Sequence, residues 1–218
     1  MTASRHLATA ATFLIAIAAA LASVHAQAAT EAAFQGAAQP FAAASAGDSA
    51  ALDKAAEAFE TLLRAEPANP LLMAYAGAAT AMRAGTTRLP WKKMGFAEDG
   101  LAQIDKALAL LTPAHDAPLQ RGTPGTLEVK FVAASTFLAV PDFMNRGARG
   151  RKLLDEVLAS PLFATSPLPF RGQVWLRAAT QAAKDQRPDD ARRWLTEIVT
   201  HGAPQAEVAK SKLKELAA

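Results

Sequence analysis

The sequence predicts an all-α protein built from stacked antiparallel helix pairs. Ala, Leu, Glu, Lys and Arg are abundant, which favours helix throughout, and no stretch alternates apolar and polar residues as a half-buried strand does. Apolar and small residues also recur four times with one spacing, which places them on one face of a helix each time. The four sets are Ala55, Phe59, Leu62 and Leu63; Gly100, Ile104, Ala107 and Leu108; Gly150, Leu154, Val157 and Leu158; and Ala191, Leu195, Ile198 and Val199.

The first 28 residues are predicted to be a secretory signal peptide. Arg5 precedes an apolar run over 7–24, and the small residues that follow suit cleavage before Gln27 or Ala29. The alternative is an uncleaved membrane anchor, because the apolar run approaches the roughly 18 residues that span a bilayer. Cleavage would leave residues 29–218 as a helical repeat domain in the periplasm or secreted from the cell.

The composition of this remaining part excludes several classes of protein. Loss of Arg5 leaves 22 of the 23 Lys and Arg residues against 20 Asp and Glu, a near balance that argues against nucleic-acid binding. The chain has no Cys, so disulfides, thiolate catalysis and a lipid-modified cysteine are excluded. No stretch after Val24 is apolar for long enough to form a transmembrane segment, so we expect a soluble protein or one peripheral to the envelope.

The stretch FETLLRAEPANPLLMAYAGAA is predicted to be a joint between two helices. Pro67 cannot continue the helix before it, while Asn69 supplies a cap and Pro70 suits the first position of the next helix. These two helices are expected over 50–65 and 71–84.

The remaining elements follow from the recurring sets and the turn residues between them. Three stretches rich in Pro, Gly and Thr are expected to be loops: AGTTRLPWKKMG, TPAHDAPLQRGTPGT and SPLFATSPLPFRG. Residues 31–47 are less well defined, and Pro40 is a candidate start for a short helix there. The other helices are expected over 92–111, 125–139, 148–160, 170–184, 188–200 and 204–217, the last as a solvated cap on the array.

The first helix pair resembles the tetratricopeptide repeat. Within ALDKAAEAFETLLRAEP, Ala55, Phe59 and Pro67 fall at the spacing of that repeat, and Gly77 lies where its first helix has a small residue that lets a neighbouring helix approach. The resemblance covers about residues 40–218, although the recurring sets begin at intervals longer than the roughly 34 residues of the repeat. It implies a right-handed α-solenoid whose curved inner surface binds another protein or an extended peptide.

Two groups of residues are candidates for contact with such a partner. Polar residues of the first helices of the pairs are expected to line the inner surface, and an exposed aromatic beside cations can anchor an interface. The alternative for the aromatic is that it packs against the preceding helix, as large aromatics mostly do. The inner-surface candidates are Tyr75, Arg83, Lys130 and Arg177, and the anchor candidates are Trp91, Lys92 and Lys93.

No motif in the sequence predicts catalysis, a metal or a cofactor. His115 and His201 lie in separate loops without a partner ligand, and no Gly-x-Ser-x-Gly elbow is present. We therefore expect a non-enzymatic exported scaffold that mediates protein–protein interaction in the bacterial envelope. The alternative is a binding protein for a small molecule, an envelope glycan or a lipid that uses a pocket between helices.

Overall fold

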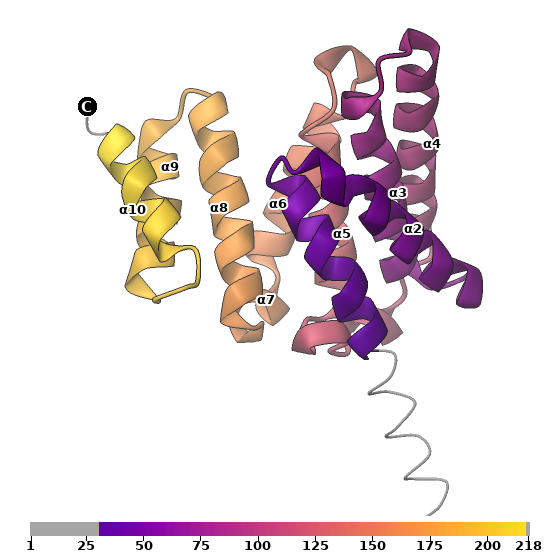
Figure 1. Ribbon diagram of the computed structural model, residues 1–218. Helices are drawn as coiled ribbons and strands as arrows, with labels where there is room; N and C mark the ends of the chain where they lie inside the picture. The colour runs from indigo at the N-terminus through magenta and orange to yellow at the C-terminus, as the bar shows by residue number, and fades with distance from the viewer. Residues whose placement is uncertain (1–30, 217–218) are drawn as a thin grey trace, which may run out of the picture.

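The computed structural model describes residues 31–216, and the regular structure in this part of the chain is helical without any strand (Figure 1). The all-α prediction is therefore confirmed for these residues. The predicted signal peptide, residues 1–28, lies outside the described residues.

The helices agree with the predicted ranges to within a few residues at each end. After a helix at 31–45 come α2 (Ser49–Ala65), α3 (Pro70–Thr86), α4 (Pro90–Ala109), α5 (Gly125–Phe137), α6 (Gly147–Ala159), α7 (Pro161–Thr165), α8 (Leu168–Lys184), α9 (Pro188–Thr200) and α10 (Ala206–Glu215). Three short 3-10 turns complete the described chain, namely η1 (Pro113–Asp116), η2 (Gln120–Gly122) and η3 (Asp142–Met144).

Three local predictions need correction. Pro40 lies inside the helix at 31–45 instead of starting one, because Phe34 and Phe41 on either side of it both pack edge-on against Phe59 and Tyr75. The first predicted loop is shorter, since α4 already begins at Pro90, and the third contains α7 and the first turn of α8. The second loop, between α4 and α5, is as predicted apart from its two 3-10 turns.

The recurring sets lie on the buried faces of α2, α4, α6 and α9. In every set the first two residues are buried and the fourth is half-buried. These faces meet a neighbouring helix in each case, because α2 and α4 both pack on α3, α6 packs on α5, and α9 packs on α8 (Figure 1). Neighbouring helices thus pack on one another along the described chain, with α2 to α6 at one end of the molecule and α8 to α10 at the other.

The joint between α2 and α3 has the predicted capping. The Asn69 side chain accepts hydrogen bonds from the amides of Leu71, at 3.0 Å, and Leu72, at 3.3 Å, and Pro70 opens the helix. These two bonds satisfy amide groups that have no partner within the helix.

Replacing Asn69 by Ala is therefore expected to lower the free energy of unfolding by about 1 kcal/mol. Asn69→Ser, which restores an acceptor, should recover most of that loss. Urea denaturation of both variants measures the difference, and equal midpoints for the two would contradict a capping role.

Helices α3 and α4 approach closely at Gly77 of α3 and Gly100 of α4. A Cβ atom built on Gly77 would lie 2.8 Å from the carbonyl oxygen of Gly100. The expectation that Gly77 permits a neighbouring helix to approach is confirmed, and the neighbour is α4. This contact positions α4, and the residues of α4 outside it line a cleft.

Candidate functional site

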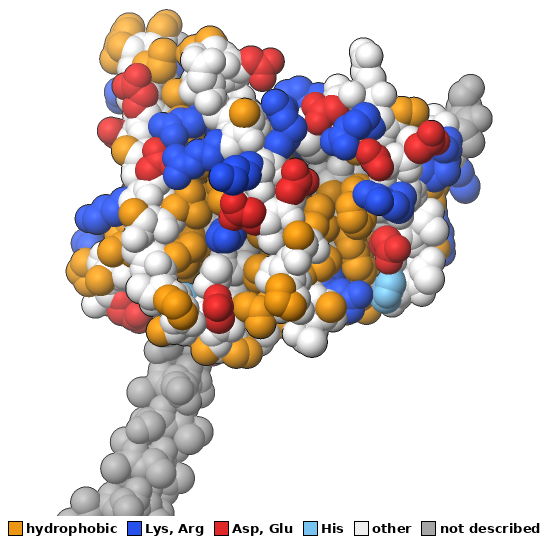
Figure 2. All heavy atoms as spheres, turned by 180° about the vertical axis from the view of Figure 1, so that it is seen from behind, with side chains coloured by type: hydrophobic (Ala, Val, Ile, Leu, Met, Phe, Trp, Pro, Cys, Tyr) orange, Lys and Arg blue, Asp and Glu red, His pale blue; other side chains and the backbone are white. Residues whose placement is uncertain are grey.

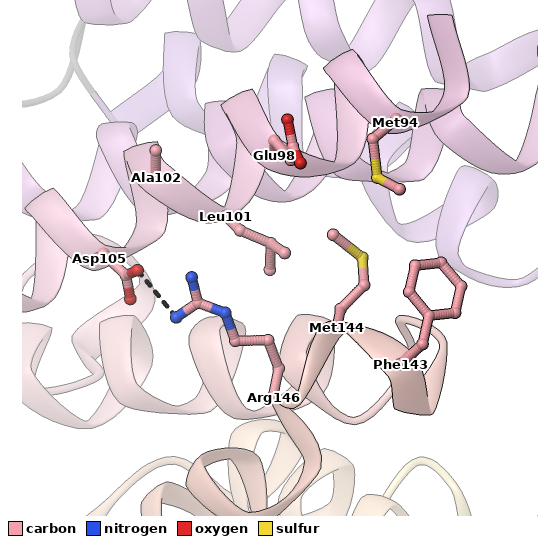
Figure 3. A pocket seen from close by; sticks show the side chains of 8 residues that line it. All are labelled: Met94, Glu98, Leu101, Ala102, Asp105, Phe143, Met144 and Arg146. Carbon is pink, nitrogen blue, oxygen red and sulfur yellow. Dashed lines mark hydrogen bonds and ion pairs between the residues drawn. The ribbon is translucent and has the colours of Figure 1, made fainter. Parts of the chain in front are cut away.

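A cleft of about 410 Å³ lies between α4 and the segment that joins α5 to α6. Its apolar part lies at one end and its charged part at the other, as Figure 3 shows. The lining residues are Met94, Glu98, Leu101, Ala102 and Asp105 from α4, with Phe143, Met144 and Arg146 from the opposite segment.

Helical periodicity explains why α4 contributes these residues. Ala97, Gly100 and Ile104 occupy its buried face, so residues such as Met94 and Glu98, which lie on a different face of the helix, are directed to the cleft, and the buried Leu101 lies at its floor. Across the cleft, η3 is ended by Asn145 in the left-handed conformation, with φ of 56°. This tight turn supplies the other side of the cleft from a very short segment.

The apolar end of the cleft is unusually open to solvent. Phe143 is 67% exposed and Met94 is 43% exposed, while Met144 is partly buried and packs against the hydrophobic core. In Figure 3 these three side chains gather at one end of the cleft. Exposed methionine and phenylalanine side chains that lie together form an adaptable apolar contact surface.

The charged end is held by ion pairs. Arg146 donates to Asp105 at 2.9 Å, and Arg149 also pairs with Asp105. The guanidinium groups of both arginines lie over the ring of Phe137, at 5.4 and 5.2 Å from its centroid. The charges here already have partners, so the apolar end is the part of the cleft best able to bind something else.

A second cleft, of about 380 Å³, lies between the end of α4 and the start of α5. Lys130 lies on its wall and donates to Glu156 at 2.7 Å. Thr126, also on the wall, has a buried hydroxyl oxygen without a hydrogen-bond partner.

A third polar feature is a buried network of Tyr75, Arg121 and Glu128. Tyr75 donates to Glu128 Oε1 at 2.7 Å, and Arg121 donates to the Tyr75 hydroxyl at 3.0 Å and to the same carboxylate oxygen. Glu128 is only 1% exposed, and its Oε2 has no hydrogen-bond partner in the described chain. Arg121, in the left-handed conformation at φ 57°, also lies over the ring of Phe34.

The electrostatics of this network follow from its burial. Burial raises the pKa of Glu128, against the opposing effect of the neighbouring Arg121 and of its hydrogen bonds. Burial and the adjacent carboxylate raise the pKa of Tyr75. None of the three residues lines either cleft, and together they join α3, α5, η2 and the helix at 31–45, so we assign the network to the stability of the fold.

The structure separates the four residues that were expected on one inner surface. Tyr75 is 7% exposed and stacks on Phe59, so the prediction that it lines an exposed surface is wrong. Arg83 pairs with Asp53 and Glu60 across α2, and Lys130 pairs with Glu156. Arg177 is half-buried and donates to the carbonyl of Ser135, and burial lowers its pKa.

The three anchor candidates lie together in the first turn of α4. Trp91 is 71% exposed, so the alternative that it packs against the preceding helix is wrong. Lys92 and Lys93 are also exposed, and neither forms an ion pair with the residues the structure describes.

The sequence analysis did not identify the cleft residues that lie across from α4, in η3, or the buried acid Glu128. Phe143 and Met144 form an apolar pair inside a short turn between Pro141 and Asn145, and apolar side chains in such a turn are a usable signal. Glu128 lies between Leu127 and Val129 on a mainly apolar helix, which is the pattern of a buried acid.

Within residues 31–216, no cluster of His, Cys, Asp and Glu side chains is arranged to hold a metal ion. In the same residues, no helix has both the length and the apolar character needed to cross a bilayer. Comparison of the chain with family models, curated proteins and solved structures finds no match.

Proposed function

We propose that this protein is a non-enzymatic scaffold that binds an apolar segment of another protein in the cleft between α4 and η3. The observation that carries this proposal is the exposure of Phe143 and Met94 at one end of that cleft. Large apolar side chains that cluster on a surface are favourable to bury against a partner, and aromatic and methionine residues are enriched in such contacts.

The chemistry of the cleft suits a helix or an extended peptide with a large apolar anchor. The anchor would pack between Met94 and Phe143, while polar groups of the partner would meet Glu98 at the rim. Glu98 is exposed and forms no ion pair with other described residues, so it is available to a basic or hydrogen-bonding group.

The tetratricopeptide-like solenoid and the export of the protein belong to this proposal. The repeated sets on α2, α4, α6 and α9 and the antiparallel helix pairs support a solenoid. The predicted signal peptide supports a periplasmic or secreted location. A small-molecule, glycan or lipid ligand has less support, because it would leave the exposed rim residues largely in water.

Loss of the two exposed apolar side chains tests this proposal. The protein and its Met94→Ala/Phe143→Ala variant are each immobilised and exposed to envelope extract, and a captured protein is then purified for affinity measurement. We expect the double variant to bind that protein at least about tenfold more weakly, because truncation of a central apolar anchor typically costs more than 1 kcal/mol.

Val208→Ala is the matched control, since Val208 is an exposed apolar residue, 49% accessible, on the distant helix α10. It should leave the affinity unchanged. Equal binding by the cleft variant and the control, or capture of chaperones alone by the unmodified protein, would count against the proposal.

A further inference from the structure

The turn from α3 into α4 forms a protruding corner with an unusual composition. Residues 88–93, with the sequence RLPWKK, are all exposed, and we refer to them as the basic corner. They comprise three cations, Arg88, Lys92 and Lys93, with the apolar residues Leu89, Pro90 and Trp91, and no acidic residue. Figure 2 shows hydrophobic side chains gathered at this end of the molecule, at the upper left of the view.

The cations of the basic corner differ from most others in the described chain because they have no acidic partner. Arg83, one turn before the end of α3, already pairs with Asp53 and Glu60. Arg146 and Arg149 pair with Asp105. Among residues 31–216, no ion pair involves a cation of the corner, so its positive charge is uncompensated.

The apolar residues of the corner face water beside these charges. Leu89 is 38% exposed, and Trp91 is the most exposed of the large apolar side chains in the described chain. Tryptophan is enriched where a membrane meets water, because its ring is apolar and its indole N–H is polar. Lysine and arginine can extend their charged ends to lipid phosphates while their aliphatic stems lie along apolar surface.

We propose that the basic corner docks the protein on an anionic lipid surface. Trp91 and Leu89 would enter the headgroup region, and Arg88, Lys92 and Lys93 would contact lipid phosphates. Charge complementarity favours this occupant, since a sheet of anionic headgroups can meet all three cations at once, whatever their rotamers. The corner is also the end of a helix pair, a protruding shape that reaches a flat surface more readily than it encloses a peptide.

This inference does not depend on the proposed protein-binding function. None of residues 88–93 lines the cleft, which begins at Met94 and extends along α4 to Asp105, so the two surfaces are built from different side chains. Loss of partner binding in the Met94→Ala/Phe143→Ala variant would therefore not bear on lipid binding.

Co-sedimentation with lipid vesicles tests the proposal. The purified protein, in the form isolated from cells, is mixed with vesicles of equal parts phosphatidylcholine and phosphatidylglycerol, and with vesicles of phosphatidylcholine alone. We expect binding to the anionic vesicles, little binding to the neutral ones, and weaker binding as salt is added. Trp91 fluorescence should shift to shorter wavelength on binding, as its ring leaves water.

Variants of the corner give the expected magnitudes. Each cation near an anionic surface strengthens binding roughly fivefold. Lys92→Gln/Lys93→Gln should therefore lower the partition coefficient by about 25-fold. Trp91→Ala should lower it by about tenfold. The charge-matched control is Lys54→Gln/Lys152→Gln, which removes two exposed lysines elsewhere on the surface and should leave binding unchanged.

Circular dichroism establishes that each variant is folded, so a loss of binding can be assigned to the surface. Equal losses in the corner variant and the control would overturn the proposal, because general positive charge would then explain the binding. It would also be overturned by equal binding to both kinds of vesicle, or by the absence of binding to either. The proposal would likewise be overturned if Trp91→Ala abolishes binding of a soluble protein and leaves vesicle binding intact.

Discussion

Replacing Gly100 by alanine is expected to lower the free energy of unfolding by about 2 kcal/mol, although alanine is the better helix former. A Cβ atom on Gly100 would lie 2.5 Å from the carbonyl oxygen of Gly77 and 2.6 Å from the amide nitrogen of Ala81. Both atoms belong to the backbone of α3, so the clash can be relieved only if the two helices separate. Overpacking of this kind costs about 1–3 kcal/mol or more, which outweighs a gain in helix propensity of at most about 1 kcal/mol.

Gly95→Ala is the matched control on the same helix. A Cβ atom on Gly95 has no other atom within 4 Å, so only the propensity gain applies and the variant should be more stable by about 0.5–1 kcal/mol. Urea denaturation measures both variants. Stabilisation by Gly100→Ala would contradict the close approach of α3 and α4.

The same pair of variants connects the fold to the cleft. Since α4 also carries the cleft residues Met94 and Glu98, displacement of α4 by Gly100→Ala should weaken partner binding. Gly95→Ala leaves α4 in place, so it should not weaken partner binding by this route. The contact between the two glycines thus helps to position the cleft residues of α4.

Helix positions were predictable because the information is local. The spacing of Gly100, Ile104 and Ala107 identifies a buried face whatever the helix packs against, and Asn69 with Pro70 marks a helix start by its own hydrogen bonding. The predicted ends consequently differ from the observed ones by only a few residues. The way in which the pairs are arranged does not follow from spacing alone.

The environment of Tyr75 could not be predicted, because it depends on a helix that the sequence leaves poorly defined. The solenoid prediction placed Tyr75 on an open inner surface. In the structure the helix at 31–45 packs on Tyr75, and its Phe34 and Phe41 lie edge-on against the Tyr75 ring. A different distant contact, between α4 and η3, builds the cleft from residues about 50 positions apart in the chain.

Trp91 had two interpretations, an exposed anchor and a packed side chain. Average burial of large aromatics favoured the packed alternative, but Trp91 lies in the first turn of α4 among residues that are all exposed. The buried face of α4 begins only at Ala97, so the first turn extends beyond the contact with α3. The frequency with which a residue type is buried does not show where a helix extends beyond its neighbour.

Replacing Arg121 by methionine is expected to lower the free energy of unfolding by about 3 kcal/mol near neutral pH. Glu128 would then keep a buried carboxylate whose only remaining partner is the Tyr75 hydroxyl. Removal of one member of a buried ion pair leaves an uncompensated charge, which typically costs about 3–5 kcal/mol. We expect the lower end of that range because the Arg121 side chain is one-third exposed, at 34%, and solvent screens its charge.

The loss of unfolding free energy in Arg121→Met should depend on pH, and the burial of Glu128 determines the direction of this dependence. Burial raises the pKa of this carboxyl above its ordinary value of 4.5, and Arg121 opposes that rise. The variant should therefore have a still higher folded-state pKa. A raised folded-state pKa contributes stability that is present below the unfolded-state pKa and is lost as pH rises through the folded-state value. The difference between variant and unmodified protein should thus be largest at neutral pH and above, and shrink as pH falls toward the ordinary carboxyl value of 4.5.

Urea denaturation across this pH range measures the effect, and two further variants test its cause. Arg121→Met/Glu128→Gln removes the buried charge, so it should recover much of the stability and lose the pH dependence. Arg88→Met removes an exposed arginine without an ion pair in the described chain and should change the free energy of unfolding by less than about 0.5 kcal/mol. An Arg121→Met variant whose loss is the same at every pH would show that the ionised Glu128 carboxylate is not the source of the destabilisation.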